Sequence, residues 1–240
     1  MAKISISIPA YNDSQTIESL ANESLAALSA ITDDYEVFII NDGSKDATSE
    51  VIRKLSRENP RIKIFEHQKN LGFGATIREV YTLPDSEWIF FIPGDAQIAP
   101  SEIIKLFPFK DKYQFILGYR KHRNDPWMRK INSWCYNTFI SMIAGKMVRD
   151  VNSVGLLKRD ALNGVSLNSA SAFIHAEILL EIIRKGASFT EIEILHKPRS
   201  HGSGSGNKWR TIFSTMNDML KYCLGRFRRK SPGRNSQEGV

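Results

Sequence analysis

The 240-residue sequence predicts an α/β fold in which helices cover both faces of a mainly parallel central sheet. Two observations lead to this prediction. Short apolar segments that suit buried strands alternate along the chain with segments of helical periodicity. Strands that are separated by helices pair in parallel, because the chain must cross back over the sheet before the next strand begins.

Five strands and several helices are expected, in the following order along the chain. The strands are ISISI at 4–8, EVFII at 36–40, RIKIF at 61–65, EWIFFI at 87–92 and QFILG at 114–118. Helical periodicity covers 14–30, 46–59 and 74–82, and Pro100 followed by Ser101 and Glu102 is typical of a helix start. Further on, Glu177 lies within a helical run of Ile and Leu.

The C-terminal part differs from the rest. Apolar residues between Trp209 and Phe227 follow i, i+3, i+4 spacing, which predicts an amphipathic helix. We therefore expect a globular domain over residues 1–206, an amphipathic basic helix over 207–230 and a disordered tail over 231–240. The helix is expected either to dock on the domain or to lie in a membrane interface with its basic end at anionic headgroups.

Acidic side chains follow the strands at the edge where parallel sheets bind ligands. Asp13 follows the first strand and Asp42 the second, although helix caps and ordinary turns also explain these two acids and Asp46. Asp95 directly follows the apolar strand WIFFI in the sequence PGDAQ. An acid at this point lies over the binding edge, so Asp95 is the strongest candidate for a functional carboxylate.

Charge and cysteine content exclude some classes of protein. Residues 207–240 hold eight basic side chains against Asp218 and Glu238, so most of the formal net charge of +7 lies in this segment. Because a duplex-binding protein carries its charge across the folded domain, we expect no nucleic-acid partner. Cys135 and Cys223 show no zinc or redox spacing, and no leader or membrane-spanning run is evident, so we expect a cytoplasmic protein.

Eight segments in order resemble the family 2 glycosyltransferases with the GT-A fold, in particular the dolichyl- or polyprenyl-phosphate sugar synthases. The segments are SIPAYND, FIINDGSKDAT, HQKNLGFGATIRE, WIFFIPGDAQIAPSEI, GYRKHRNDPWMRK, VRDVNSVGLLKR, FIHAEILLEIIRKG and HKPRSHGSGSGNKWR, which together span about residues 3–210. The resemblance implies a GT-A nucleotide-diphospho-sugar transferase fold. It also implies transfer of a hexose, with inversion, from a UDP- or GDP-sugar to a polyprenyl phosphate.

The resemblance assigns the donor site. It implies that the nucleotide sugar is bound by Pro9, Ala10, Tyr11, Asn12, Asp13, Asp42, Gly72, Gly94, Asp95 and Ala96. A carboxylate in this pocket accepts a hydrogen bond from the N–H groups of uracil or guanine. The family pattern at the fourth strand is Asp-x-Asp-x-Gln, which holds Mg²⁺ or Mn²⁺ against the diphosphate. Here Asp95 and Gln97 match the metal ligands, and Pro93 replaces the first acid.

The resemblance also implies an acceptor site in the second half of the chain. The acceptor phosphate is expected to contact Arg120, Arg129, Arg199, Ser203, Ser205 and Lys208. The catalytic residues are expected to be Asp95, Arg120, Arg129, Asp150 and Glu177. By default the helical position of Glu177 predicts a solvated carboxylate, whereas the family places an acid near the acceptor.

Two other functions remain open. The same domain, using Asp150 or Glu177 as a general base, could glycosylate a saccharide hydroxyl in cell-surface polysaccharide assembly. The loss of the first acid at Pro93 is also compatible with a non-catalytic sugar-nucleotide-binding protein. For a lipid acceptor, we expect peripheral association with the cytoplasmic face of a membrane, or a membrane-embedded partner.

Overall fold

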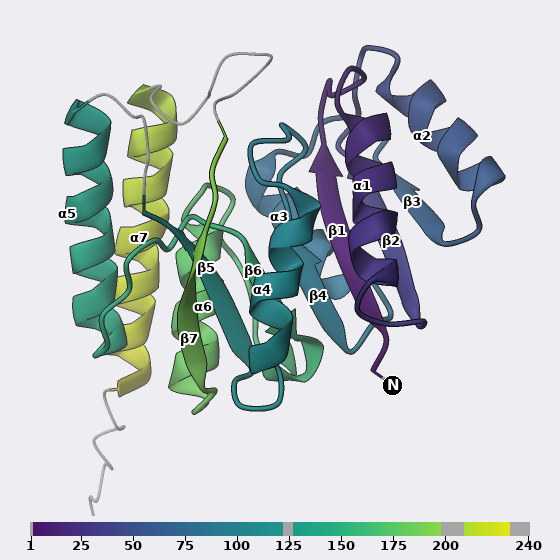
Figure 1. Cartoon of the computed structure of the whole chain (residues 1–240). Coiled ribbons are helices and arrows are strands. Elements are labelled where there is room, and N and C mark those ends of the chain that lie inside the picture. The colour runs from purple at the N-terminus through teal and green to yellow at the C-terminus, as the bar shows by residue number, and fades with distance from the viewer. Residues whose placement is uncertain (1, 122–126, 198–208, 231–240) are drawn as a thin grey trace, which may run out of the picture.

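The structure is a computed structural model that describes residues 2–121, 127–197 and 209–230 (Figure 1). Within these ranges one sheet of seven strands has the order β3-β2-β1-β4-β6-β5-β7. The strands are β1 (Ile4–Ala10), β2 (Tyr35–Asn41), β3 (Ile62–Glu66), β4 (Trp88–Phe91), β5 (Phe115–Arg120), β6 (Gly155–Lys158) and β7 (Phe189–Ile194). All pairs are parallel except those of β6, which runs antiparallel to both β4 and β5.

Helices cover the sheet on both sides, which confirms the predicted fold class. The helices are α1 (Ile17–Ser29), α2 (Thr48–Glu58), α3 (Phe73–Thr82), α4 (Ile103–Leu106), α5 (Trp127–Ala144), α6 (Ile174–Arg184) and α7 (Trp209–Lys230). Short 3₁₀ turns are η1 (Pro100–Glu102), η2 (Phe107–Phe109) and η3 (Arg159–Leu162). Figure 1 shows α1 and α4 in front of the sheet and α6 behind it.

The strands in the middle of the sheet are buried because helices cover both faces, whereas the edge strands β3 and β7 are mostly half-buried or exposed. Trp88–Phe91 is buried throughout, as expected for a parallel strand in the middle of a sheet. Ile6, Ile39 and Leu156 are fully buried at the centre of the core. The five predicted strands are all present, with ends that differ by at most two residues.

The strands β6 and β7 and the helix α5 were not predicted from the sequence. The strand β6 has only four residues, and four of the six residues of β7 are half-buried, so neither shows a clear apolar run. The helix α5 has one fully buried residue, Ile140, and therefore lacks a distinct core-facing pattern.

The C-terminal helix α7 begins at Trp209 and has two different faces. One face packs on the domain through Met219 and Tyr222, and the Tyr222 hydroxyl donates to the Glu181 carboxylate at 2.9 Å. The other face exposes a line of apolar side chains. The helix thus docks on the domain through one face, while its interfacial role at a membrane, which we expected as the alternative, stays a prediction. The predicted tail at 231–240 lies outside the described residues.

Candidate active site

The carboxyl ends of β1, β2 and β4 lie at one edge of the sheet, and the loops that follow β1 and β4 touch. A Cβ atom on Gly94 would lie 2.7 Å from Oδ2 of Asp13 and 2.8 Å from the carbonyl oxygen of Pro9. The Thr16 hydroxyl donates to the carbonyl oxygen of Gly94 at 2.8 Å. Only glycine permits this approach, so position 94 brings Asp13 next to the loop that contains Asp95.

The loops after β1 and β2 are bonded to each other. Asn12 has a positive φ of 58°, an uncommon conformation for a residue with a side chain. Its N–H donates to the Ser44 hydroxyl at 2.9 Å, and its side-chain oxygen accepts from the N–H of Lys45 at 2.8 Å. Next to Asn12, Ala10 is buried and Tyr11 is half-exposed. The structure thus brings together the predicted donor-site residues at this edge.

Asp46, which the sequence suggested as a helix cap, contacts the start of α2 from the position before the N-cap residue Ala47. Its carboxylate accepts from the N–H and the hydroxyl of Thr48 at 3.0 and 2.5 Å, at the start of α2. It also accepts from the N–H of Ser14 at 3.3 Å. Burial alone would raise the pKa of Asp46, but the hydrogen bonds from Thr48 and Ser14 outweigh it and lower the pKa to about 2. Asp46 therefore links the β1 loop to α2 as an anion.

Asp42 is a buried carboxylate that holds the loop before α3. Its Oδ1 accepts from the N–H of Leu71 at 2.8 Å and lies 2.7 Å from Nδ1 of His67, while Oδ2 accepts from the N–H of Gly72 at 3.0 Å. Gly72 has φ 92°, a conformation that glycine adopts readily. The sequence analysis assigned Asp42 and Gly72 to one site, and the structure joins them. It did not identify His67, whose pairing with Asp42 depends on the fold.

Asp95 lies in a sharp turn whose shape is set by Ala96, with φ 56°. The N–H of Gln97 donates to Oδ1 of Asp95 at 3.2 Å. The backbone of Gln97 also accepts from the N–H of Lys197 at 2.8 Å, and its side-chain amide donates to the carbonyl oxygen of Lys197 at 3.4 Å. The chain after β7 therefore reaches the loop of Asp95. Four residues predicted to bind the acceptor phosphate lie outside the described residues: Arg199, Ser203, Ser205 and Lys208.

The residues at this turn fit a hard divalent cation. Asp95 offers a carboxylate and Gln97 an amide oxygen, the ligand types that Mg²⁺ and Mn²⁺ prefer. Among the described residues, no cluster of three or more His, Cys, Asp or Glu side chains could hold a metal ion. Within the described residues, Asp95 and Gln97 would thus supply a partial shell of one carboxylate and one amide. Such a shell suits a cation that also coordinates the oxygens of a bound diphosphate.

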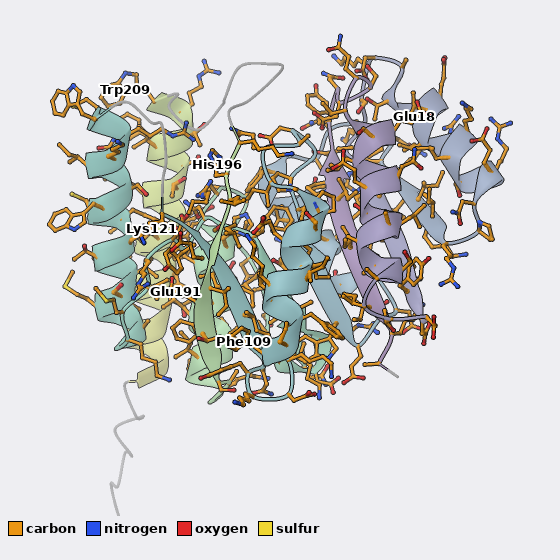
Figure 2. All side chains as sticks on the ribbon, viewed as in Figure 1. Glu18, Phe109, Lys121, Glu191, His196 and Trp209 are labelled. Atoms are coloured by element: carbon orange, nitrogen blue, oxygen red, sulfur yellow. The ribbon has the colours of Figure 1, made fainter. Side chains whose placement is uncertain are left out.

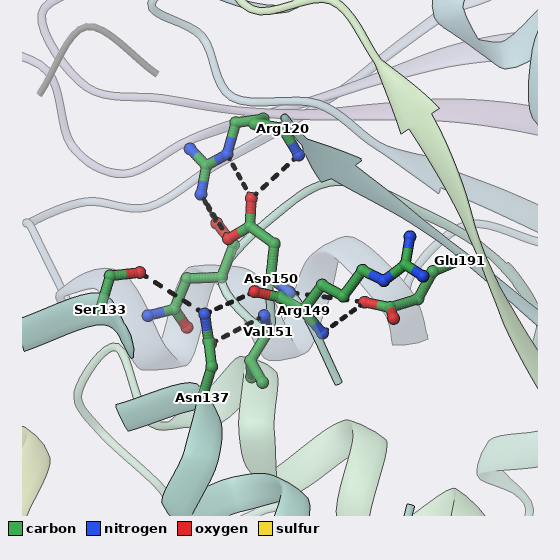
Figure 3. Close-up of polar contacts among 8 residues, drawn as sticks. Arg120, Ser133, Asn137, Arg149, Asp150, Val151 and Glu191 are labelled. Atoms are coloured by element: carbon green, nitrogen blue, oxygen red, sulfur yellow. Dashed lines mark hydrogen bonds and ion pairs between the residues drawn. The ribbon is translucent and has the colours of Figure 1, made fainter. Parts of the chain in front are cut away.

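Arg120 and Asp150 form a buried, bidentate ion pair (Figure 3). The Asp150 carboxylate accepts from Nε and Nη2 of Arg120 at 2.7 and 2.8 Å and from its backbone N–H at 3.2 Å. Nη2 also donates to the carbonyl oxygen of Asn152 at 3.0 Å. The side chains of Arg120 and Asp150 are 12% and 6% exposed. Arg120 ends β5 at the same edge as Asp95, whereas Arg129 is exposed in the first turn of α5.

A cleft of about 1000 Å³ lies between α5 and residues 145–150. Its basic lining residues are Arg120, Lys121, Lys130, Lys146 and Arg149, and its acidic lining residue is Asp150. Trp134, Met142 and Met147 add apolar surface. Figure 2 shows Lys121 and Glu191 in this part of the molecule. The sequence analysis did not identify Lys121, Lys130, Lys146 or Arg149, although the absence of acidic residues from 127 to 149 was a usable sign.

Glu191 binds the backbone of two residues that line the cleft, Arg149 and Asp150. Its carboxylate accepts from the N–H of Arg149 at 2.8 Å and from the N–H of Asp150 at 3.4 Å (Figure 3). Burial raises the pKa of the Glu191 carboxyl, and these two hydrogen bonds oppose that effect. Glu191 on β7 therefore fixes the backbone that presents Asp150 to Arg120.

Glu177 is buried, so the default expectation of a solvated carboxylate is wrong. Its two oxygens accept from the N–H of Asn168 at 3.0 and 3.1 Å, and one of them also accepts from the N–H of Ser169 at 2.8 Å. Glu177 lines a smaller cavity of about 420 Å³ together with Asp218 and Tyr222. Glu177 therefore anchors the loop before α6. Periodicity within one helix cannot reveal this role, because the partners of Glu177 lie outside the helix.

The comparisons with known proteins agree with this geometry. Residues 5–169 match the family model described as glycosyl transferase family 2. The chain belongs to this family. It is 27% identical over 237 residues to a dodecaprenyl-phosphate galacturonate synthase of Rhizobium johnstonii, and the alignment covers 96% of the chain and 69% of the relative. It is 26% identical over 225 residues to an undecaprenyl-phosphate 4-deoxy-4-formamido-L-arabinose transferase of Serratia proteamaculans, with 92% and 68% covered.

Solved structures support the fold. Glucosyl-3-phosphoglycerate synthase of Mycobacterium tuberculosis, in complex with Mn²⁺, UDP and glucosyl-3-phosphoglycerate, matches with a TM-score of 0.69 and 14% identity. The match covers 94% of this chain and 80% of that structure. The complex of the same enzyme with Mg²⁺ and UDP gives a TM-score of 0.68 at 15% identity. The predicted GT-A fold is thus confirmed, and the chain is a glycosyltransferase.

Proposed function

We propose that this glycosyltransferase moves a hexose from a UDP- or GDP-sugar to a polyprenyl phosphate, with inversion and with the help of Mg²⁺ or Mn²⁺. The observation that carries the proposal is the basic cleft at the end of β5, on the same sheet edge as Asp42 and Asp95. Both curated relatives are named for polyprenyl-phosphate acceptors, which supports the same class of acceptor here.

The donor half of the site would bind the nucleotide sugar through its two ends. Asp42 and Asp13 would accept hydrogen bonds from the N–H groups of uracil or guanine. Asp95 and Gln97 would hold the divalent cation, which neutralises charge on the departing diphosphate when it is bound. Solved complexes of the structural neighbour with Mn²⁺ or Mg²⁺ and UDP support this arrangement.

The acceptor half favours a phosphate over a hydroxyl. A hydroxyl nucleophile needs a general base, and Asp150 and Glu177 are the candidates in this region. Asp150 is held in a bidentate pair by Arg120, and Glu177 accepts three hydrogen bonds from backbone N–H groups. A phosphate is ionised at neutral pH and needs cations rather than a base. Lys146 and Arg149 would supply these cations together with the predicted Arg120 and Arg129.

The molecule also offers a surface that suits a lipid bilayer. No helix among the residues the structure covers is both long and apolar enough to cross a membrane. Over residues 209–225, the exposed large apolar residues of α7 are Trp209, Phe213, Met216, Leu220 and Leu224. Those of α5 include Trp127, Ile131, Trp134 and Met142. Figure 2 shows Trp209 at the start of α7, at the edge of the molecule. With the basic residues of both helices, these lines support peripheral binding to an anionic membrane.

One experiment tests the donor site and the cation together. The binding of UDP and GDP is measured by isothermal titration calorimetry with and without Mn²⁺, for the parent protein and for Asp95→Ala. Mn²⁺ should raise the affinity of the parent about tenfold or more, and Asp95→Ala should abolish this increase, because the variant lacks the carboxylate proposed to hold the cation. Sugar transfer to undecaprenyl phosphate should be lost in the same variant.

Asp85→Ala is the matched control, because Asp85 lies before the opposite end of β4 and its side chain is 92% exposed. It should leave both the Mn²⁺ effect and the transfer unchanged. An Asp95→Ala protein that kept its Mn²⁺-dependent binding and its turnover would remove Asp95 from the site. Binding without turnover on phosphate and hydroxyl acceptors alike would favour the non-catalytic alternative.

A further inference from the structure

We propose that His67 is a positioning residue of the donor site, which holds the Asp42 carboxylate in the orientation that accepts a nucleobase N–H. This inference rests on the proposed base contact at Asp42. His67 directly follows β3, so its place at the sheet edge continues the series formed by the ends of β1, β2 and β4. None of the site residues predicted from the sequence lies at the end of β3.

The imidazole of His67 is fixed on several sides. Its side chain is 5% exposed, and Nδ1 lies 2.7 Å from Oδ1 of Asp42. The backbone N–H of His67 donates to the carbonyl oxygen of Asn41 at 2.9 Å, which sets the point from which the ring extends. The ring of Phe65 meets the imidazole edge-on, with centroids 5.4 Å apart. A buried imidazole in such surroundings has little freedom to leave Asp42.

Glu79 on α3 lies on the other side of the ring. Its Oε2 is 2.7 Å from Nε2 of His67, although the direction of this contact is not that of a well-aligned hydrogen bond. A carboxylate near each ring nitrogen specifies one ring orientation, because a flip of the ring would put carbon atoms where the nitrogens are. Glu79 thereby fixes His67, as His67 fixes Asp42.

The hydrogen bonds of Asp42 explain why this orientation matters for a ligand. A carboxylate has about four acceptor positions. Oδ1 is used by His67 and Leu71, and Oδ2 is used by Gly72. Among the described residues Oδ2 thus keeps capacity for one more donor, which is the number that a uracil N3–H or a guanine N1–H supplies. Without His67, only the two N–H groups of the 71–72 loop would orient the carboxylate.

The test uses two substitutions at one position. His67→Phe removes the donor but keeps a ring beside Phe65, whereas His67→Asn restores an N–H near the place of Nδ1. Calorimetry with UDP, GDP and CDP, all in the presence of Mn²⁺, gives the affinity and the preference over cytosine. His67→Phe should weaken the better of UDP and GDP by about tenfold and reduce its preference over CDP, and His67→Asn should recover most of both. In turnover assays the donor KM should rise while kcat changes by less than about threefold.

Arg61→Gln is the matched control, because Arg61 contacts the carbonyl oxygens of Asp33 and Tyr35 at the opposite end of β3. Arg61→Gln should lower stability without changing the preference for one base over another. If His67→Phe acted only by lowering stability, it would leave this preference unchanged as well. If His67→Phe does not fold, Glu79→Leu replaces it. A loss of about threefold or more in affinity then supports the proposal, and unchanged affinity overturns it.

Asp42→Ala separates this inference from the function on which it rests. If Asp42→Ala weakens nucleotide binding and His67→Phe does not, the positioning role of His67 is wrong and the base contact stands. If Asp42→Ala leaves the affinities for UDP, GDP and CDP unchanged, the base contact itself is wrong and the role of His67 falls with it.

Discussion

Replacement of Asp150 by Asn should destabilise the protein by several kcal/mol, because it leaves a buried guanidinium without its counter-charge. Asp150 accepts three hydrogen bonds from Arg120, and the two side chains are 6% and 12% exposed. After the substitution, the carbonyl oxygen of Asn152 and one amide oxygen would still accept from the guanidinium. The charge would remain buried, and its desolvation would no longer be offset.

The magnitude follows from the burial. Removing one partner of a buried pair costs about 3–5 kcal/mol, whereas an exposed pair contributes about 0–1 kcal/mol. Since Asn keeps one acceptor, we expect about 3 kcal/mol for Asp150→Asn. The double replacement Arg120→Met with Asp150→Leu should recover most of this loss, because no buried charge remains.

Urea unfolding of the purified variants, analysed with a common m-value, measures these differences. Asp111→Asn is the control, because Asp111 pairs with Lys110 at the surface and its side chain is 81% exposed. It should change the free energy of unfolding by less than about 1 kcal/mol. A loss below about 1 kcal/mol for Asp150→Asn as well would refute the reasoning. So would a double variant that is less stable than Asp150→Asn.

Two further predictions concern pH and membranes. Burial lowers the pKa of His175 to about 4, an effect that the charge of Arg120 strengthens and the charge of Asp150 opposes. The stability contributed by the neutral imidazole is therefore complete above about pH 6.5 and is lost as the pH falls toward 4. Urea titrations from pH 7 to 4 should therefore show a loss that is up to about 3 kcal/mol larger than in His175→Gln, and equal pH dependence would contradict this. The double variant Trp209→Ser with Phe213→Ser should partition about 100-fold less onto anionic liposomes, as measured by co-sedimentation. Ile104→Ser is the control, because it removes an exposed apolar side chain on α4, and it should leave the partitioning unchanged. Equal partitioning of all three proteins would remove α7 from the interface.

Point substitutions suit the membrane test better than truncation of α7. Asp218 accepts from the N–H groups of Ala170 and Ser171 at 3.0 Å, and Tyr222 donates to Glu181. Deleting the helix would free the loop at 169–171, which also receives the N–H of Gly74 at the start of α3. Loss of binding after truncation would therefore mix a membrane effect with damage to the fold.

The sequence by itself determined five of the seven strands in the described sheet, and the edge at which the candidate site lies. Alternation of apolar strands with helices specifies parallel pairing, and parallel pairing places the acids that follow β1, β2 and β4 on one edge. This is why Asp13, Asp42 and Asp95 were predicted together and lie in loops that touch or follow neighbouring strands. Asp95 was singled out by its place directly after an apolar strand, whereas turns and caps also explain Asp13 and Asp42, which were assigned to the donor site through the family resemblance.

The tertiary structure decided which group each of the other polar side chains meets. Glu177 is polar within an apolar helix, and only the loop at 168–169 shows that its carboxylate is a buried anchor. His67 and Asp42 are 25 residues apart, and Arg120 and Asp150 are 30 apart. Local periodicity records which face of a helix or strand is buried, but the partner of a buried charge is set by packing between distant segments. For that reason the basic cleft and the line from Glu79 through His67 to Asp42 became visible only in the folded chain.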